Sequence, residues 1–256
     1  GAVHRLQQIL GVFLPPAARA VFADQLSHYF SRAEYKKFVE HFSARRPIVF
    51  VGPYEHHSNE ISWREGWAEV VEVDLTPAGL LDLDDLEQKV SNPEYAGRVK
   101  MGAFSAASNV SGVKTPVYDV ARILHRNGAL AFFDFAAIAP YVEIDVCRDD
   151  EAYFDAIYFS PHKFLGGPGS SGVLVFREEI YRSDLPPTVS GGGTVNYVWS
   201  DGQDYSTDIE VREKAGTPGI LQTMRASLAM ELKERLGTER IARREDELLA
   251  RGINLL

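Results

Sequence analysis

Short apolar runs alternate with helix-like segments along this chain, and this alternation constrains the fold more than any other feature. Strands are expected in the ranges 47–52, 68–73, 99–104, 130–133, 152–160 and 172–176. Helices are expected in 2–11, 16–44, 80–90, 116–127, 220–237 and 238–251. Strands that alternate with helices are typical of an α/β domain built around a largely parallel sheet.

Composition limits the class of protein. The 256 residues are 45% hydrophobic, which fits one sizeable globular domain. The formal net charge is −9 and there is no basic stripe, so no nucleic acid is expected as a partner. No run of about 18 apolar residues is present, so no membrane span is expected. The single cysteine, Cys147, excludes an internal disulfide and fits a reducing compartment, from which we expect a cytoplasmic location.

Lys163 is the residue whose setting most strongly suggests chemistry. It lies between the apolar run 154–159 and a glycine-rich turn, 166–169, which leads into the strand-like run 172–176. A lysine in a partly desolvated pocket has a lowered pKa and can act as a nucleophilic amine, as a Schiff base with a carbonyl cofactor requires. The glycine-rich turn matches neither a Walker loop nor a dinucleotide fingerprint, so nucleotide binding is not expected.

Several polar side chains follow the expected strands directly. They are His56 and His57, Asn109, Asp134, and His162 with Lys163. In open α/β sheets, ligands bind outside the carboxyl ends of the strands, so this pattern predicts one shared site. The adjacent pair His56 and His57 has no spaced set of further ligands, and metal binding is therefore not expected.

Each of these side chains also has an ordinary structural interpretation. Asp134 could pair with a protonated ring nitrogen, as pyridoxal phosphate requires, or it could cap the following segment. His56 could stack on a cofactor ring or cap a turn. Ser160 and His162 could donate hydrogen bonds to a phosphate, or they could belong to an ordinary Ser-Pro turn.

Seven stretches of the chain occur in an order that matches a known family. They are 55–59, 108–112, Asp134 with Ala136, 160–163, 166–169, 191–193 and 215–218. Together they resemble the class V aminotransferase group of fold-type I pyridoxal-phosphate (PLP) enzymes, and within it the cysteine desulfurase/selenocysteine lyase-like branch. The resemblance implies an α/β large domain whose mostly parallel central sheet carries helices on both faces.

The resemblance also implies how the cofactor would be held. Lys163 would form the Schiff base with PLP and then move protons at the substrate carbon. Asp134 would pair with the pyridine nitrogen, and His56 would stack on the ring. Ser160 and His162 would hold the phosphate.

Two further residues concern the substrate and a second subunit. Asn109 would lie near the phenolic oxygen of the cofactor and the carboxylate of the substrate. Thr217 would reach the phosphate of a neighbouring subunit, which implies a homodimer with shared active sites.

Three departures from the family pattern bear on the reaction. Family desulfurases usually carry a glutamine three residues after the aspartate, where this chain has Ala137. Their persulfide-forming cysteine lies well beyond the lysine in a small C-terminal domain, whereas Cys147 precedes Lys163. The carboxylate-binding arginine of the family also belongs to that C-terminal domain.

The same comparison gives an expected division of the chain. Residues 1–237 are expected to form the PLP-binding large domain, and 238–256 to begin the connection to the small domain. The chain starts at Gly1 without a methionine and stops in helix-like sequence, from which we expect a longer natural protein. Residues 1–4 resemble the start of the phosphate-binding helix, whose family threonine would precede Gly1.

The function that the resemblance implies is PLP-dependent chemistry on a small-molecule amino acid. The first hypothesis is a cysteine desulfurase-like lyase in which Lys163 acts as acid and base while the ring and Asp134 stabilise a carbanion. A class V aminotransferase is the alternative within the same enzyme class. A non-catalytic scaffold with the PLP fold is the alternative of another class; Ala137 motivates it, and the retained Lys163, Asp134 and His56 argue against it.

Overall fold

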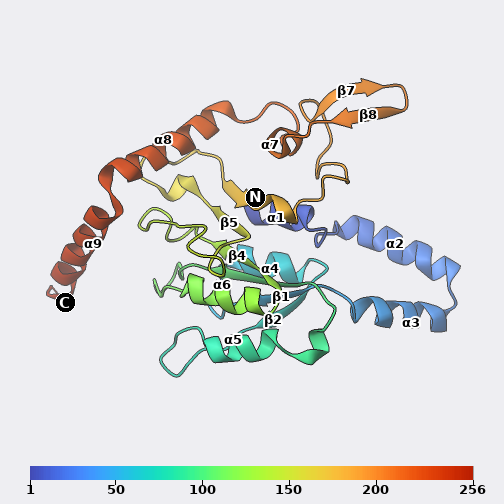
Figure 1. Cartoon of the computed structure of the whole chain (residues 1–256), viewed down its shortest axis with the longest axis horizontal. Helices are drawn as coiled ribbons and strands as arrows, with labels where there is room; N and C mark the ends of the chain where they lie inside the picture. The colour runs from blue at the N-terminus through green and yellow to red at the C-terminus, as the bar shows by residue number, and fades with distance from the viewer. Residues whose placement is uncertain (256) are drawn as a thin grey trace.

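A six-stranded sheet forms the centre of the structure, a computed structural model that describes residues 1–255 (Figure 1). The strands are β1 (Ile48–Val51), β2 (Glu69–Glu72), β3 (Lys100–Ser105), β4 (Ala129–Asp134), β5 (Ala156–Phe159) and β6 (Val173–Phe176). Their spatial order is β2-β1-β3-β4-β5-β6, and only β6 pairs antiparallel. All six overlap the ranges expected from the sequence. The prediction of an α/β fold with a mostly parallel sheet is confirmed.

Helices fill both sides of this sheet and extend from it. In chain order they are α1 (Ala2–Ile9), α2 (Pro16–Tyr29), α3 (Arg32–Ser43), α4 (His57–Arg64), α5 (Leu83–Val90), α6 (Val117–Arg126), α7 (Ile209–Arg212), α8 (Ile220–Leu236) and α9 (Thr238–Ile253), with short 3₁₀ turns η1 (Pro93–Tyr95), η2 (Pro161–Lys163) and η3 (Glu178–Ile180). The break between α8 and α9 falls at Gly237, which has a positive φ of 77°. The expected division into two domains at this residue stays a prediction.

The two faces of the sheet carry separate apolar cores. Alternate residues of a strand point to opposite faces, so neighbours such as Val49 and Phe50 belong to different cores. Phe50 and Phe133 pack under α5 and α6, whereas Val49 and Phe132 pack under α1 and α4. On the second face the Trp63 ring of α4 stacks on Phe132 at 6.4 Å between ring centroids. The central strands β1, β3, β4 and β5 are therefore buried on both sides, which explains their largely apolar sequence. The edge strands β2 and β6 are only partly buried.

The single helix expected over 16–44 is wrong, because the structure divides it into α2 and α3. Phe30 and Ser31 adopt extended backbone angles between the two helices. The Ser31 side chain accepts a hydrogen bond from the Glu34 N–H, and the Glu34 carboxylate accepts from the Ser31 N–H at 2.9 Å. This reciprocal capping box starts a new helix within a continuous helical pattern.

Four elements were not expected from the sequence. They are α4, α7 and the hairpin of β7 (Val195–Trp199) with β8 (Gly202–Tyr205). The segment that forms α4 is polar and short, so its pattern alone does not predict a helix. It is stabilised from outside the helix, since the His56 side chain caps its first turn and Trp63 anchors it to the sheet.

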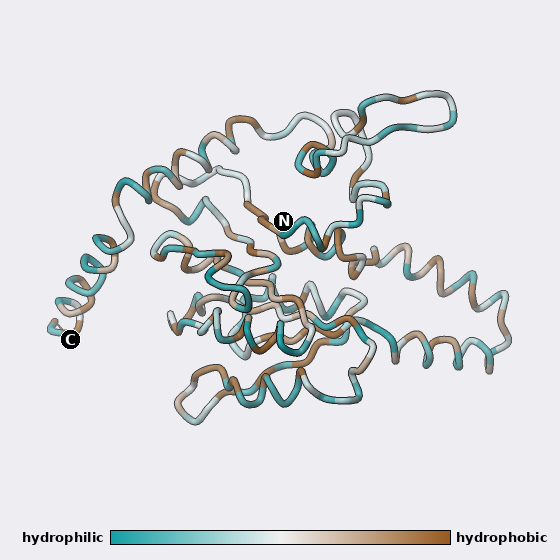
Figure 2. The backbone as a smooth tube through the Cα atoms, viewed as in Figure 1, coloured by the Kyte–Doolittle hydropathy of each residue, from teal (hydrophilic) through white to brown (hydrophobic). Residues whose placement is uncertain are grey.

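Figure 2 locates the apolar residues along the backbone, with brown strands at the centre and a largely hydrophilic α9. Helices α2, α3 and α9 have no buried residues. Over residues 1–255, every helix is too short or too polar to cross a bilayer.

Candidate active site

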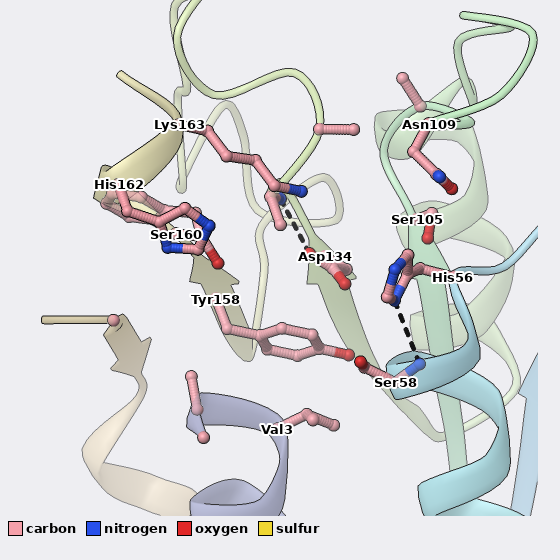
Figure 3. A pocket seen from close by; sticks show the side chains of 17 residues that line it. Val3, His56, Ser58, Ser105, Asn109, Asp134, Tyr158, Ser160, His162 and Lys163 are labelled. Atoms are coloured by element: carbon pink, nitrogen blue, oxygen red, sulfur yellow. Dashed lines mark hydrogen bonds between the residues drawn. The ribbon is translucent and has the colours of Figure 1, made fainter. Parts of the chain in front are cut away.

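A cavity of about 460 Å³ lies at the carboxyl ends of β3, β4 and β5 (Figure 3). Its lining residues are Gly1, Ala2, Val3, His56, Ser58, Ser105, Ala107, Asn109, Asp134, Ala136, Ala137, Tyr158, Phe159, Ser160, His162, Lys163 and Gly172. Six of the seven site residues expected from the sequence are therefore brought together: Lys163, Asp134, His56, Asn109, Ser160 and His162. The position of the cavity follows from the parallel strands, whose carboxyl ends meet at one edge.

The floor of the cavity is a row of three polar side chains on neighbouring strands. Ser105 of β3 is in register with Asp134 of β4, and Asp134 is in register with Tyr158 of β5. Residues in register on parallel strands point to the same face of the sheet, so the three side chains stand side by side. All three are buried.

Asp134 presents one carboxylate oxygen to the protein and leaves the other for a ligand. Oδ1 accepts a hydrogen bond from the Ala136 N–H at 2.8 Å, while Oδ2 has no hydrogen-bond partner within residues 1–255. Burial raises the pKa of Asp134, although the Ala136 bond and the positive charges of Lys163 and His56 act in the opposite direction. A buried carboxylate of this kind is stabilised by a cationic partner in the cavity. The capping and the ligand-binding interpretations are thus compatible, one for each oxygen.

His56 caps α4 and at the same time faces the cavity (Figure 3). Its Nδ1 accepts a hydrogen bond from the Ser58 N–H at 3.1 Å. A ring nitrogen that accepts cannot carry the hydrogen, so the neutral ring has its hydrogen on Nε2. The cap therefore fixes both the place of the ring and which nitrogen can donate to a ligand.

Lys163 ends the short turn η2, and its side chain extends into the cavity. Its backbone N–H donates to the Ser160 carbonyl at 3.0 Å, so the two residues are held in one turn with His162. The lysine amine has no hydrogen-bond partner among the described residues. The side chain is exposed at the mouth of the cavity, and the partial desolvation expected from its apolar neighbours in sequence is not seen.

The glycine-rich turn 166–169 supports the lysine segment and does not line the cavity. A Cβ at Gly167 would lie 1.8 Å from the Pro161 carbonyl oxygen, so only glycine fits there. Gly166 and Gly169 have positive φ angles of 77° and 85°, which favour glycine as well.

The N-terminus of α1 forms another side of the cavity, through Gly1, Ala2 and Val3. The first intrahelical bond runs from the Arg5 N–H to the Gly1 carbonyl at 3.1 Å, so the preceding N–H groups have no intrahelical acceptor. Free N–H groups and the helix dipole favour an anion at this position. Together with Ser160 and His162, the helix start gives the cavity an anion-binding side.

Comparison with known proteins agrees with this geometry. The family model for class-V aminotransferases matches residues 35–256. The chain belongs to this family. Among curated relatives, a cysteine desulfurase of Synechococcus elongatus is 33% identical over 79% of this chain and 31% of its own length. A protein of Xylella fastidiosa strain 9a5c named probable cysteine desulfurase is 31% identical over 79% of this chain and 47% of its own length.

Solved structures of the same family share the fold. An apo cysteine desulfurase from Thermococcus onnurineus NA1 aligns with a TM-score of 0.69 at 29% identity, over 84% of this chain and 55% of that chain. A cysteine desulfurase from Escherichia coli aligns with a TM-score of 0.65 at 27% identity, over 76% and 47%. The class-V, cysteine desulfurase-like assignment and the fold-type I architecture with helices on both faces are thus confirmed. The chain spans between 31% and 55% of the length of these relatives.

Three polar residues at the site, the half-buried Glu55 and the buried Asn59 and Tyr158, had no role assigned from the sequence of this class-V protein. Glu55 and Asn59 belong to the matching stretch 55–59, and Tyr158 belongs to the apolar run before Lys163. Asn59 and Tyr158 are 0% and 3% exposed. Burial raises the pKa of Glu55, and nearby Asp134 adds to this effect, while bonds from Ser105 and Asn59 oppose it. The available signal was the position of Tyr158, which directly precedes the strand end.

Other expected residues lie outside the cavity lining. Thr217 is exposed in the loop 215–218, whose Gly216 N–H donates to Gly192 at 2.7 Å, so the two glycine-containing stretches touch. The role of Thr217 toward a second subunit stays a prediction. Cys147 is an exposed free cysteine on the loop before β5, and His57 is exposed on α4.

Proposed function

We propose that this class-V protein is a PLP-dependent enzyme that acts on an amino acid through Lys163, with a cysteine desulfurase-like lyase as the first candidate. The observation that carries the proposal is one cavity in which the Lys163 amine, the Asp134 carboxylate and the His56 ring meet the anion-binding side. The names of the aligned relatives support the reaction class.

The chemistry of the lining fits PLP. Asp134 Oδ2 has no protein partner within residues 1–255 and is available to a protonated ring nitrogen. The free Lys163 amine is suited to an aldehyde, and the α1 start with Ser160 and His162 is suited to a phosphate. When bound, PLP supplies an aldehyde for covalent linkage to amines and a ring that stabilises negative charge on the substrate α-carbon.

The residues of the chain would then divide the remaining work. Lys163 would hold the cofactor, release it to the incoming amine and move a proton at the α-carbon. Asp134 would keep the ring nitrogen protonated, because a buried carboxylate is stabilised by an adjacent cation. His56 would cover one face of the ring and present its Nε2 hydrogen to the ligand.

The side of the cavity toward Asn109 would take the substrate. Asn109, Ala137 and Lys163 also line an adjoining pocket of about 470 Å³ together with the loop 108–112. The amide of Asn109 and the hydroxyls of this loop suit a carboxylate. We further propose that a second copy of the chain contributes Thr217 and that the protein acts as a homodimer.

A class V aminotransferase is the second candidate, and Ala137 favours it. A methyl group replaces the amide donor that desulfurases usually carry at this position. The reaction would then depend on proton transfer by Lys163 alone.

Product analysis tests these alternatives in the full-length protein loaded with PLP. A desulfurase is expected to release alanine and, with a thiol reductant, an equal amount of sulfide from cysteine. An aminotransferase is expected to exchange an amino group with a keto acid instead. If neither product forms and Lys163→Ala behaves like the wild type, the enzymatic proposal is wrong and a scaffold role remains.

A further inference from the structure

A chain of buried and partly buried hydrogen bonds runs beneath the cavity, from β5 through α4 to β3. The Tyr158 hydroxyl donates to Asn59 Oδ1, and Asn59 Nδ2 donates to Glu55 Oε2 at 2.7 Å. Glu55 Oε2 also accepts from the Ser105 hydroxyl at 2.6 Å. Tyr158, Asn59 and Ser105 come from three separate elements and are buried, so water has little access to them, whereas Glu55, directly before α4, is half-buried. The partners of each polar group are therefore fixed by the protein.

Asn59 uses its whole side-chain amide in this chain. Besides Glu55, its Nδ2 donates to the Ala103 carbonyl of β3 at 3.1 Å, and its Oδ1 accepts from Tyr158. A flipped amide would place donors against the Tyr158 hydroxyl and an acceptor against the Glu55 carboxylate and the Ala103 carbonyl. The Glu55 carboxylate and the Ala103 carbonyl, which can only accept, thus select a single orientation of the Asn59 amide, and in this orientation Oδ1 takes the hydrogen of the Tyr158 hydroxyl.

Both Asn59 and Glu55 attach the start of α4 to the sheet. Glu55 accepts hydrogen bonds from the Gly52 N–H at 3.2 Å and from the Ser105 N–H at 2.9 Å and 2.7 Å to its two oxygens. His56 lies directly after Glu55 and caps the first turn of the helix that contains Asn59. The backbone on either side of His56 is therefore tied to β3, and its ring can occupy only a narrow range of positions.

We infer that Tyr158 is a positioning residue for His56: its hydroxyl, acting through Asn59 and Glu55, fixes the start of α4 and keeps the His56 ring in its capping place with the hydrogen on Nε2. This inference rests on the proposed function only where it concerns PLP, whose ring His56 would cover. The effect on the ring itself is a property of the protein without cofactor.

The test is Tyr158→Phe in the full-length protein, which removes one hydroxyl and keeps the ring. Tyr118→Phe is the matched control. Tyr118 lies on α6, and its hydroxyl donates to the Asp145 carbonyl at 3.1 Å, away from the cavity. Nitrogen-15 labelled histidine NMR without cofactor reports which nitrogen of His56 carries the hydrogen, and His56→Gln identifies the resonances. The wild type and Tyr118→Phe are expected to show only the Nε2–H form, and Tyr158→Phe a mixture of both forms.

A second variant keeps the test informative if Tyr158→Phe is poorly folded. Ser105→Ala removes only the hydroxyl bond to Glu55 and retains the backbone bonds, so it is expected to give the same change with smaller amplitude. Unchanged His56 resonances in a folded Tyr158→Phe protein, or in a folded Ser105→Ala protein, would overturn the inference.

Cofactor binding separates this inference from the proposed function. In Tyr158→Phe the dissociation constant for PLP is expected to rise about tenfold, as it would if about a tenth of the molecules kept the binding-competent ring position. If the wild type binds no PLP while the His56 resonances respond as expected, the proposed function fails and the positioning role stands. If PLP binds equally to both proteins and the resonances do not change, the positioning role fails alone.

Discussion

The backbone of Gly167 packs directly against the carbonyl oxygen of Pro161, so closely that a side-chain carbon on the glycine would lie 1.8 Å from that oxygen. Pro161 begins the turn that ends at Lys163. The lysine segment therefore requires a glycine at position 167, although Gly167 does not line the cavity.

Replacing this glycine is expected to damage the site from outside. Gly167→Ala should lower the free energy of unfolding by about 3 kcal/mol, because backbone atoms must move to admit the methyl group. Gly192→Ala is the control, since a Cβ there meets no atom within 4 Å. Denaturant unfolding of both variants checks the difference, and equal stability would show that the turn accommodates a side chain.

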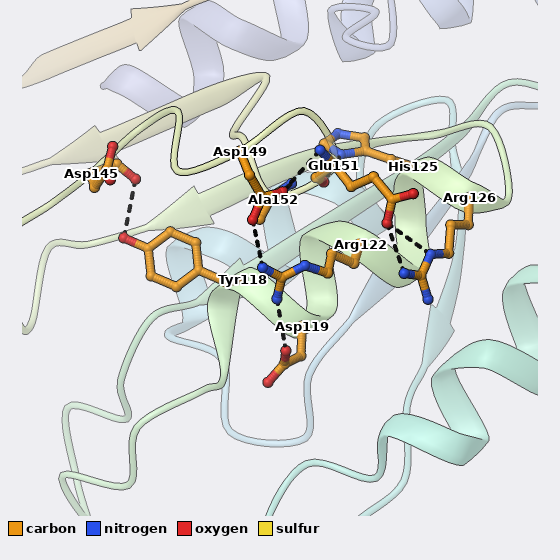
Figure 4. A network of polar contacts seen from close by, with 9 residues as sticks. All are labelled: Tyr118, Asp119, Arg122, His125, Arg126, Asp145, Asp149, Glu151 and Ala152. Carbon is orange, nitrogen blue, oxygen red and sulfur yellow. Dashed lines mark hydrogen bonds and ion pairs between the residues drawn. The ribbon is translucent and has the colours of Figure 1, made fainter.

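The His125 ring links α6 to the segment that directly precedes β5. Its Nε2 lies 2.9 Å from Asp155 Oδ2, and its Nδ1 bonds the Glu151 carbonyl at 2.7 Å, beside the ion pairs of Arg122 and Arg126 (Figure 4). Burial of the ring lowers the His125 pKa, but the bonds to Asp155 and Glu151 outweigh burial and raise it above its usual 6.5, while nearby Arg177 opposes them.

This link predicts a stability difference that depends on pH. A histidine pKa raised in the folded state adds stability that is fully present below the unfolded value and is lost as pH rises through the folded value. His125→Ala should cost about 2 kcal/mol near pH 5 and less near pH 8. Urea unfolding at both pH values measures this cost, with the exposed His28→Ala as control; a cost that does not fall with pH would contradict the assignment.

Asp134 predicts a pH dependence of the same sign, because its pKa is also raised in the folded protein. Burial raises the pKa of Asp134 above its usual 3.8. Without cofactor, the folded wild type therefore loses stability relative to Asp134→Asn as the pH rises from the usual pKa through the raised one. Asp134→Asn should therefore be about 1 kcal/mol more stable than the wild type near pH 8, with the difference vanishing in acid. The same variant should bind PLP more weakly. Thermal unfolding with and without PLP measures both effects. If Asp134→Asn is less stable than the wild type near pH 8 without cofactor, the raised pKa of the buried carboxylate is contradicted.

The capping box between α2 and α3 gives a local prediction. Ser31→Ala removes the acceptor for the Glu34 N–H and should destabilise α3 by about 1 kcal/mol. Since α3 has no buried residues, the effect should be confined to this helix. Hydrogen exchange is expected to accelerate across α3 and to remain unchanged in β3 and β4; uniform acceleration would indicate a wider structural role.

Much of the fold was predictable because the central strands β1, β3 and β4 are buried on both faces and read as largely apolar runs. The break at Ser31 was not, since helical spacing continues across it and only the Ser31–Glu34 pair marks the new start. Helix α4 was missed because its stabilising contacts, the His56 cap and the Trp63 stack, depend on tertiary structure.

For the site, strand ends predicted five residues that share one cavity, because the carboxyl ends of parallel strands meet at a common edge. His57, predicted from the same pattern, lies outside the cavity lining. The hydrogen-bonded chain of Glu55, Asn59 and Tyr158 could not be predicted, since its members are 4 and 99 residues apart in sequence. The exposure of Lys163 also differs from its apolar sequence neighbours, because the side chain points out of the strand layer into the cavity.

Borohydride reduction of the full-length protein after incubation with PLP tests the central claim most directly. Peptide mass spectrometry is expected to find the pyridoxyl group on Lys163 and to lose it in Lys163→Ala. Lys233 is the control because it is a second amine that could react with PLP: burial lowers its pKa, and it lines two other pockets. Lys233→Ala should keep full modification of Lys163. Modification that persists in Lys163→Ala, or that resides on another lysine in the wild type, would contradict the account.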